Sequence, residues 1–210
     1  MPNEKLLIRT GAISGILACI VDVISSIVLG SRITGYNHLR SPLSQLGIQS
    51  SPVAKEIAFW WDMVGVFMII FGIGLYIAYR NKKKPALTAA ILLMLYGLGE
   101  GLGSGFFPAD KAGSLHSGTG IFHIIVGSIG VSGLAIFPLI MPYLISGIRK
   151  FSMIIFIVGI SGVVLFMSSW IIDNPNNFIN IYRGFFQRLF ITNYYIYIIV
   201  VAIKIFSINK

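Results

Sequence analysis

Apolar side chains dominate six stretches of the chain, and short polar segments separate them. Each stretch has roughly the 20 residues that an α-helix needs to cross about 30 Å of hydrocarbon. The pattern therefore predicts an all-α integral membrane bundle of six transmembrane helices, forming a single domain over residues 1–210. The predicted helices cover residues 6–29, 57–79, 86–105, 117–140, 151–172 and 189–206.

The composition supports a membrane protein. Of the 210 residues, 56% are hydrophobic and only 11% are charged, which is too apolar for an ordinary soluble domain. Six spans leave room for one helical bundle and none for a soluble catalytic domain.

The placement of Lys and Arg predicts the orientation in the membrane. With a cytoplasmic N-terminus, ten of the 16 basic residues fall on the cytoplasmic side, which favours a cell-membrane protein with both termini inside. The net charge of +9 is scattered over short loops without a contiguous stripe. Membrane lipids, and not nucleic acid, are therefore the expected partners.

Cys19 is the single cysteine, which excludes an intramolecular disulfide. The residues before it are faintly similar to a lipoprotein cleavage site, but the apolar run continues through Leu29. We therefore expect an uncleaved first helix. No internal repeat of the kind found in inverted-repeat transporters is evident.

The connections on the predicted outer side are long. Residues 30–56 and 173–188 exceed the length of about 12–15 residues above which loops tend to be functional or disordered. The predicted cytoplasmic links, residues 80–85 and 141–150, are short and basic. Function is therefore expected at the outer side.

Ionisable residues gather near this outer side. By helical rise, Asp22 lies about 24 Å and Glu100 about 21 Å from the inner ends of their helices. Asp62 and His123 lie in the first turns of helices that enter from outside, and His116 precedes the helix that carries His123. Buried charge must be paired or hydrated, so these groups predict one connected polar pocket.

Two roles remain open for the deeper carboxylates. Asp22 and Glu100 are embedded in apolar sequence and need a partner such as His123, Arg188 or Arg40. Such pairing could fix only the helix register, or it could serve function. The glycines at 97, 99, 101, 103 and 105 predict close helix packing, with unwinding toward a cavity as the alternative.

The histidines do not form a simple metal site. His116 and His123 are seven residues apart, about 10 Å along a regular helix, which is too far for both to bind one zinc ion. A composite site in which His38 joins His116 or His123, together with Asp110 or Glu100, is an alternative.

A hydrolytic triad is a further alternative. Ser41 or Ser44 in the first outer loop could act with a histidine and Asp110, but no nucleophile-elbow pattern supports this arrangement.

Several short motifs carry a resemblance to a known family. They are residues 36–47 (YNHLRSPLSQLG), residues 106–110 (FFPAD), His116 with His123, and residues 184–189 (GFFQRL). Together they resemble the prokaryotic membrane family catalogued as domain of unknown function 998, over nearly the whole chain. The resemblance implies a six-helix membrane protein and supplies no activity. The family commonly has Asp-Pro where this chain has Asn37-His38, which argues against His38 as a metal ligand.

The leading hypothesis is an outward-facing polar pocket that binds a lipid or other small amphiphile. A hydrolase or lipid-modifying enzyme is the second, with His123 as acid/base and Ser44 or a metal-bound water as nucleophile. A proton-coupled permease is the third, with Asp22 and Glu100 as carriers. The sequence assigns neither a cofactor nor a metal. The expected pocket residues are Ser44, Asp110, His116, His123, Arg188 and Arg40 toward the mouth, with Asp22 and Glu100 deeper.

Overall fold

The computed structural model describes residues 2–110 and 117–208 as helices joined by loops, with no β-strand among them. Six helices are long and apolar enough to cross a membrane, so the predicted all-α bundle of six spans is confirmed. Five of them are α1 (Pro2–Ser31), α2 (Ala54–Tyr79), α5 (Gly118–Ile140), α6 (Arg149–Ser168) and α8 (Arg183–Phe206). The third span joins α3 (Lys84–Tyr96), the π-helix η3 (Gly97–Gly103) and α4 (Ser104–Phe106).

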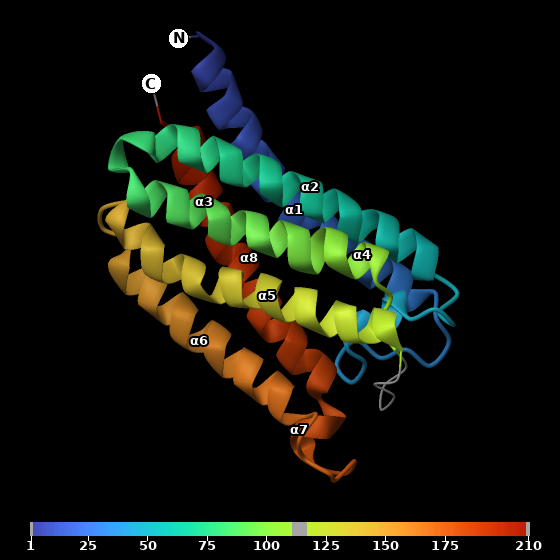
Figure 1. The fold of residues 1–210 in the computed structure, drawn as a ribbon. Helices are drawn as coiled ribbons and strands as arrows, with labels where there is room; N and C mark the ends of the chain where they lie inside the picture. Colours follow the sequence, from blue (N-terminus) through green and yellow to red (C-terminus); the bar gives the residue numbers. More distant parts are fainter. Residues whose placement is uncertain (1, 111–116, 209–210) are drawn as a thin grey trace.

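Short elements fold the connections. They are the 3₁₀-helices η1 (Leu43–Gly47), η2 (Arg80–Lys82) and η4 (Met141–Tyr143), and the one-turn helix α7 (Phe178–Ile181). Both termini lie at one end of the bundle with η2 and η4 (Figure 1), and we call this the termini end. The opposite end carries residues 32–53 and 169–182, and we call it the loop end.

At the loop end, two predicted boundaries differ from the structure by four residues or more. The fifth span ends at Ser168 and not at 172. The last span begins at Arg183 and not at 189. Polar side chains in its first turns form hydrogen bonds to the first loop, so this part of the helix is stable without a continuous apolar sequence. The expected loop 173–188 therefore contains α7 and the start of α8.

The glycines of the third span allow close approach on two opposite sides. A Cβ built on Gly101 would lie 2.3 Å from the Cα of Gly65 in α2. A Cβ built on Gly99 would lie 2.2 Å from the carbonyl oxygen of Val126 in α5. The span is thus packed between α2 and α5, as the predicted packing role requires.

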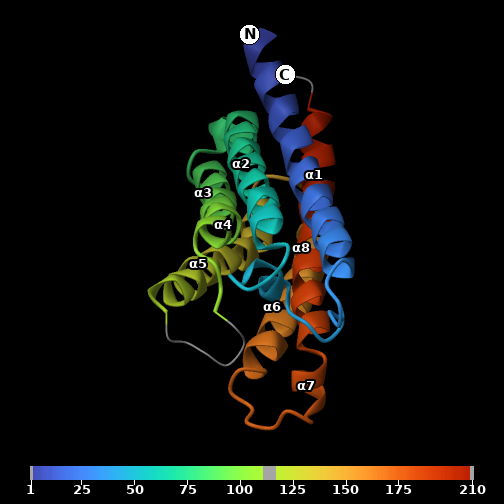
Figure 2. The same ribbon diagram turned by 90° about the vertical axis from the view of Figure 1, so that its right-hand side faces the viewer.

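The helices separate toward the loop end. Figure 1 shows α5 and α6 together at the η4 turn and diverging from there, and Figure 2 shows the same divergence from a second side. α6 packs mainly against α8 and much less against α5. The buried apolar core is consequently continuous near the termini end, whereas the loop-end half leaves space between α5 and α6.

The orientation of this bundle can be tested by labelling single cysteines. Asn81 in η2 and Gln49 in the first loop are both exposed and lie at opposite ends, while the native Cys19 is buried. Because basic residues favour the cytoplasm, a membrane-impermeant maleimide added to intact cells should label Gln49→Cys and spare Asn81→Cys. Labelling of both positions from outside would contradict the predicted topology.

Candidate functional site

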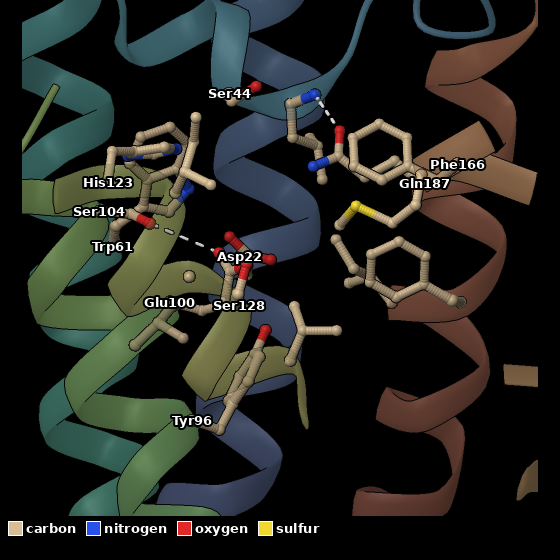
Figure 3. Close-up of a pocket in the computed structure, with 18 of the residues that line it drawn as sticks. Asp22, Ser44, Trp61, Tyr96, Glu100, Ser104, His123, Ser128, Phe166 and Gln187 are labelled. Carbon is tan, nitrogen blue, oxygen red and sulfur yellow. Dashed lines mark hydrogen bonds between the residues drawn. The ribbon is translucent and has the colours of Figure 1, made fainter. Parts of the chain in front are cut away.

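A cavity of about 410 Å³ lies in the loop-end half of the bundle. Most of its lining side chains are apolar, but Asp22, Ser44, Glu100 and His123 lie among them. These four come from α1, η1, η3 and α5. The structure therefore brings four of the predicted site residues to one cavity, as Figure 3 shows.

Asp22 is held by a chain of hydroxyl groups. Asp22 is only 6% exposed. The Tyr195 hydroxyl donates a hydrogen bond to Oδ2 of Asp22 at 2.8 Å. The hydroxyl of Tyr96 lies 2.6 Å from that of Tyr195. Since Tyr195 has one hydroxyl proton and donates it to Asp22, Tyr96 is the donor in this second bond. The chain joins α3, α8 and α1 at one depth. Trp61 of α2 also interacts with the Asp22 carboxylate.

Glu100 lies at the centre of the π-helix, where its carboxylate faces α5 and the cavity. Ser104, one turn further on, donates to Oε2 at a long 3.4 Å (Figure 3). A Cβ built on Gly127 would lie 3.3 Å from Oε1, so this glycine leaves room for the carboxylate. The Glu100 and Asp22 carboxylates are close enough to interact electrostatically.

His123 is fixed by the end of the third span. Its Nδ1 lies 2.8 Å from the carbonyl oxygen of Phe107. A carbonyl only accepts, so Nδ1 carries a proton and donates it. The second ring nitrogen, Nε2, has no hydrogen-bond partner among the described residues, and in a neutral imidazole it is an acceptor.

The first outer loop is attached to the start of α8 by Gln187 and Arg188, and we call this attachment the loop clamp. The Gln187 side-chain oxygen accepts from the backbone N–H of Leu43 at 2.6 Å. Leu43 begins η1, and both Leu43 and Ser44 line the cavity. The clamp therefore holds one wall of the cavity in place.

Arg188 supplies the rest of the loop clamp. Its Nη1 donates to the carbonyl oxygens of His38 and Ser41, the latter at 2.9 Å. Its Nη2 donates to the Tyr36 hydroxyl at 2.7 Å. A Cβ built on Gly184 would lie 2.5 Å from the Ser41 carbonyl oxygen, so only a glycine lets the loop approach the helix this closely.

His38 is neutral in this arrangement. Its Nδ1 lies 3.4 Å from Nη2 of Arg188, which can only donate. Burial, and then the Arg188 charge, lower the pKa of the His38 imidazole, and both effects favour the neutral acceptor.

The structure does not bring the predicted cationic residues to the cavity. The Arg188 guanidinium is engaged by the loop, and Arg40 is exposed. Among the described residues, neither Asp22 nor Glu100 has a basic group within 4 Å. The hydroxyl groups of Tyr195 and Ser104 supply hydrogen bonds to Asp22 and Glu100, and the Arg188 charge acts on Asp22 from a longer distance.

Asp110 caps a helix. Its carboxylate accepts from the backbone N–H and the hydroxyl of Ser117, and the Ser117 hydroxyl in turn accepts from the N–H of Gly120. This is an N-terminal cap for α5. His116 lies outside the described residues, so its expected place at the pocket mouth stays a prediction.

The groups needed for the hydrolytic alternative are near each other but not joined. Ser44 and His123 both line the cavity, yet no hydrogen bond links them in the part of the chain that the structure describes. Within residues 2–110 and 117–208, no group of three or more His, Cys, Asp or Glu could hold a metal ion. The geometry therefore presents separate polar groups, without an assembled nucleophile and base.

Sequence reasoning missed four important cavity residues: Trp61, Tyr96, Gln187 and Tyr195. Each is a hydrogen-bonding side chain within an apolar span or at its start, and burial in hydrocarbon requires such groups to find partners. These uncharged polar side chains are therefore a signal of the site in addition to the carboxylates and histidines.

Comparison with known families matches residues 16–204 to the family described as "Protein of unknown function (DUF998)". The chain belongs to this family, which confirms the resemblance inferred from its motifs. No curated protein and no solved structure matches the chain significantly. Two of the motifs, residues 36–47 and 184–189, are the two sides of the loop clamp.

Removing the Arg188 guanidinium should loosen the first loop. Arg188→Met should reduce the hydrogen-exchange protection of the Ser41 and Leu43 amides by roughly 30-fold, equivalent to about 2 kcal/mol for lost charged hydrogen bonds. Arg183→Met is the matched control, because no described residue bonds the Arg183 side chain. Equal protection in the wild-type protein and Arg188→Met would contradict the clamp.

Proposed function

We propose that this DUF998 protein binds an amphiphile in the loop-end cavity, with its apolar chain between α5 and α6 and its polar head beside Asp22 and Glu100. The observation that carries this proposal is that the carboxylates of Asp22 and Glu100 lie in one cavity whose other lining side chains are mostly apolar. A volume of about 410 Å³ lies within the range of small-molecule sites.

The residues at the cavity's edge support entry from the membrane. Ile124 of α5, Met167 of α6 and Trp170 in the turn after α6 line the cavity and are also substantially exposed. Ile171, which also lines the cavity, is 83% exposed. In a membrane-spanning bundle, such exposed apolar side chains contact acyl chains. The divergence of α5 from α6 gives a chain a lateral route that crosses no polar loop.

The polar end supports an occupant with a head group. A purely apolar ligand would leave the carboxylates without added hydrogen bonds in a dry site, which is unfavourable. With the proposed orientation, the head would lie in the half of the membrane opposite the basic termini end. Binding is thus the function that the geometry favours over hydrolysis or transport.

Entry of an acyl chain can be measured by fluorescence quenching. Trp61 lines the cavity and is 7% exposed, so lipid outside the bundle hardly reaches it. A Trp60→Phe, Trp170→Phe protein retains Trp61 alone. In vesicles of lipids brominated along the acyl chain, Trp61 fluorescence should be strongly quenched, because the chain carries bromine into the cavity.

A matched pair of substitutions identifies the route. Ser128→Phe places a ring in the cavity and should reduce the quenching to less than half. Ser132→Phe, four residues further along α5 at an exposed position outside the lining, should leave it unchanged. Absence of quenching, or an equal effect of both substitutions, would refute the proposal.

A further inference from the structure

We propose that the head of the bound amphiphile carries an ammonium group with N–H donors, an inference that rests on the proposed function. The ammonium could belong to a phospholipid head group or to a single-chain amine. In either case its partners are the carboxylates of Asp22 and Glu100 and the free nitrogen of His123.

The counter-charge that the cavity receives comes from outside its lining, where the Arg188 guanidinium acts on Asp22 from a distance. The lining includes two carboxylates and neither Lys nor Arg. The ion pairs among the described residues, Arg32 with Glu56 and Arg80 with Glu4, lie at the two ends of the bundle. Since buried charges are normally paired, a cation supplied by the ligand would complete the site.

Glu100 and His123 offer hydrogen-bond acceptors to a ligand in the cavity. Glu100 receives one long bond at Oε2, and no described residue donates to Oε1. His123 has Nε2 left over, because Nδ1 is committed to a backbone carbonyl. Each carboxylate oxygen can accept two hydrogen bonds, and an ammonium offers three donors and no acceptor. An ammonium would therefore supply donors to the acceptors of Glu100 and His123.

The same groups disfavour a phosphate beside Asp22 and Glu100. A phosphate would need donors and positive charge, but its natural partner, Arg188, is engaged by the first loop. Two carboxylates would repel it.

The backbone supports a ligand at Glu100 independently of charge. Glu100 occupies the middle of the seven-residue π-helix Gly97–Gly103. π-Helical turns are rare and occur frequently at functional sites. Gly127 is placed on α5 where a side chain would press against the carboxylate.

Head-group preference can be measured with the protein that retains only Trp61. The host vesicles are phosphatidylglycerol, with a minor component of either brominated phosphatidylethanolamine or brominated phosphatidylglycerol. Dodecylamine and dodecanol are then compared as competitors at equal membrane concentration. The amine should relieve quenching at about tenfold lower concentration than the alcohol, as expected for charge-assisted hydrogen bonds.

Substitutions test which groups select the ammonium. Glu100→Gln should abolish the preference for the amine while chain quenching persists, and Glu100→Asp should retain much of it. Glu56→Gln, which removes a carboxylate outside the cavity, is the matched control. Asp22→Asn is a second, independent test should Glu100→Gln fail to fold.

The outcomes separate this inference from the proposed function. If the protein prefers brominated phosphatidylethanolamine over brominated phosphatidylglycerol, and also dodecylamine over dodecanol, the ammonium belongs to a phospholipid. If it prefers only dodecylamine over dodecanol, the ammonium belongs to a single-chain amine. Quenching without any preference for either amine overturns the ammonium inference and leaves chain binding intact. No quenching by any lipid overturns the proposed function itself.

Discussion

A carboxyl group within a membrane-spanning bundle must find its hydrogen bonds inside the protein, because hydrocarbon offers none. Asp22 meets this requirement through Tyr195, which is itself supported by Tyr96. These contacts join α1, α8 and α3 in the same half of the bundle. They fix the polar end of the cavity on three helices, while α6 is left out of the network. The divergence of α6 from α5 therefore opens the cavity without disturbing the groups that define its chemistry.

The third span brings the second carboxylate to the same place. Its glycines permit contact with α2 on one side and α5 on the other, and the π-helix turns Glu100 toward the cavity. The loop clamp then closes the loop end, because Gln187 positions η1 directly over the cavity wall. Close backbone packing, a widened helical turn and a tethered loop thus act together. The result is a cavity with mostly apolar lining in which two carboxylates lie, and the proposed binding of an amphiphile rests on this combination.

Hydropathy and helical rise predicted the six spans, and they predicted that Asp22, Glu100 and His123 occupy one depth. Depth follows from sequence position alone, so this much was accessible without a structure. The hydrogen-bond partners of these residues could not be predicted in this way, since they depend on how each helix is rotated about its axis. Arg188 was expected at the cavity as a partner for the buried carboxylates, but α8 begins about two turns earlier than predicted and the Arg188 guanidinium donates to backbone carbonyls. Long-range hydrogen bonds between a loop and a helix leave no periodic signal in one sequence.

The central claim is that Glu100 faces a cavity that membrane-dissolved molecules can enter. Dicyclohexylcarbodiimide, an apolar reagent that modifies carboxyl groups in apolar surroundings, tests this directly when the modified residues are mapped by mass spectrometry. The account predicts modification of Glu100 in the reconstituted protein, and its suppression by Ser128→Phe. Modification confined to carboxyl groups outside the cavity, such as Glu4 and Glu56, with Glu100 unmodified at saturating reagent, would contradict it.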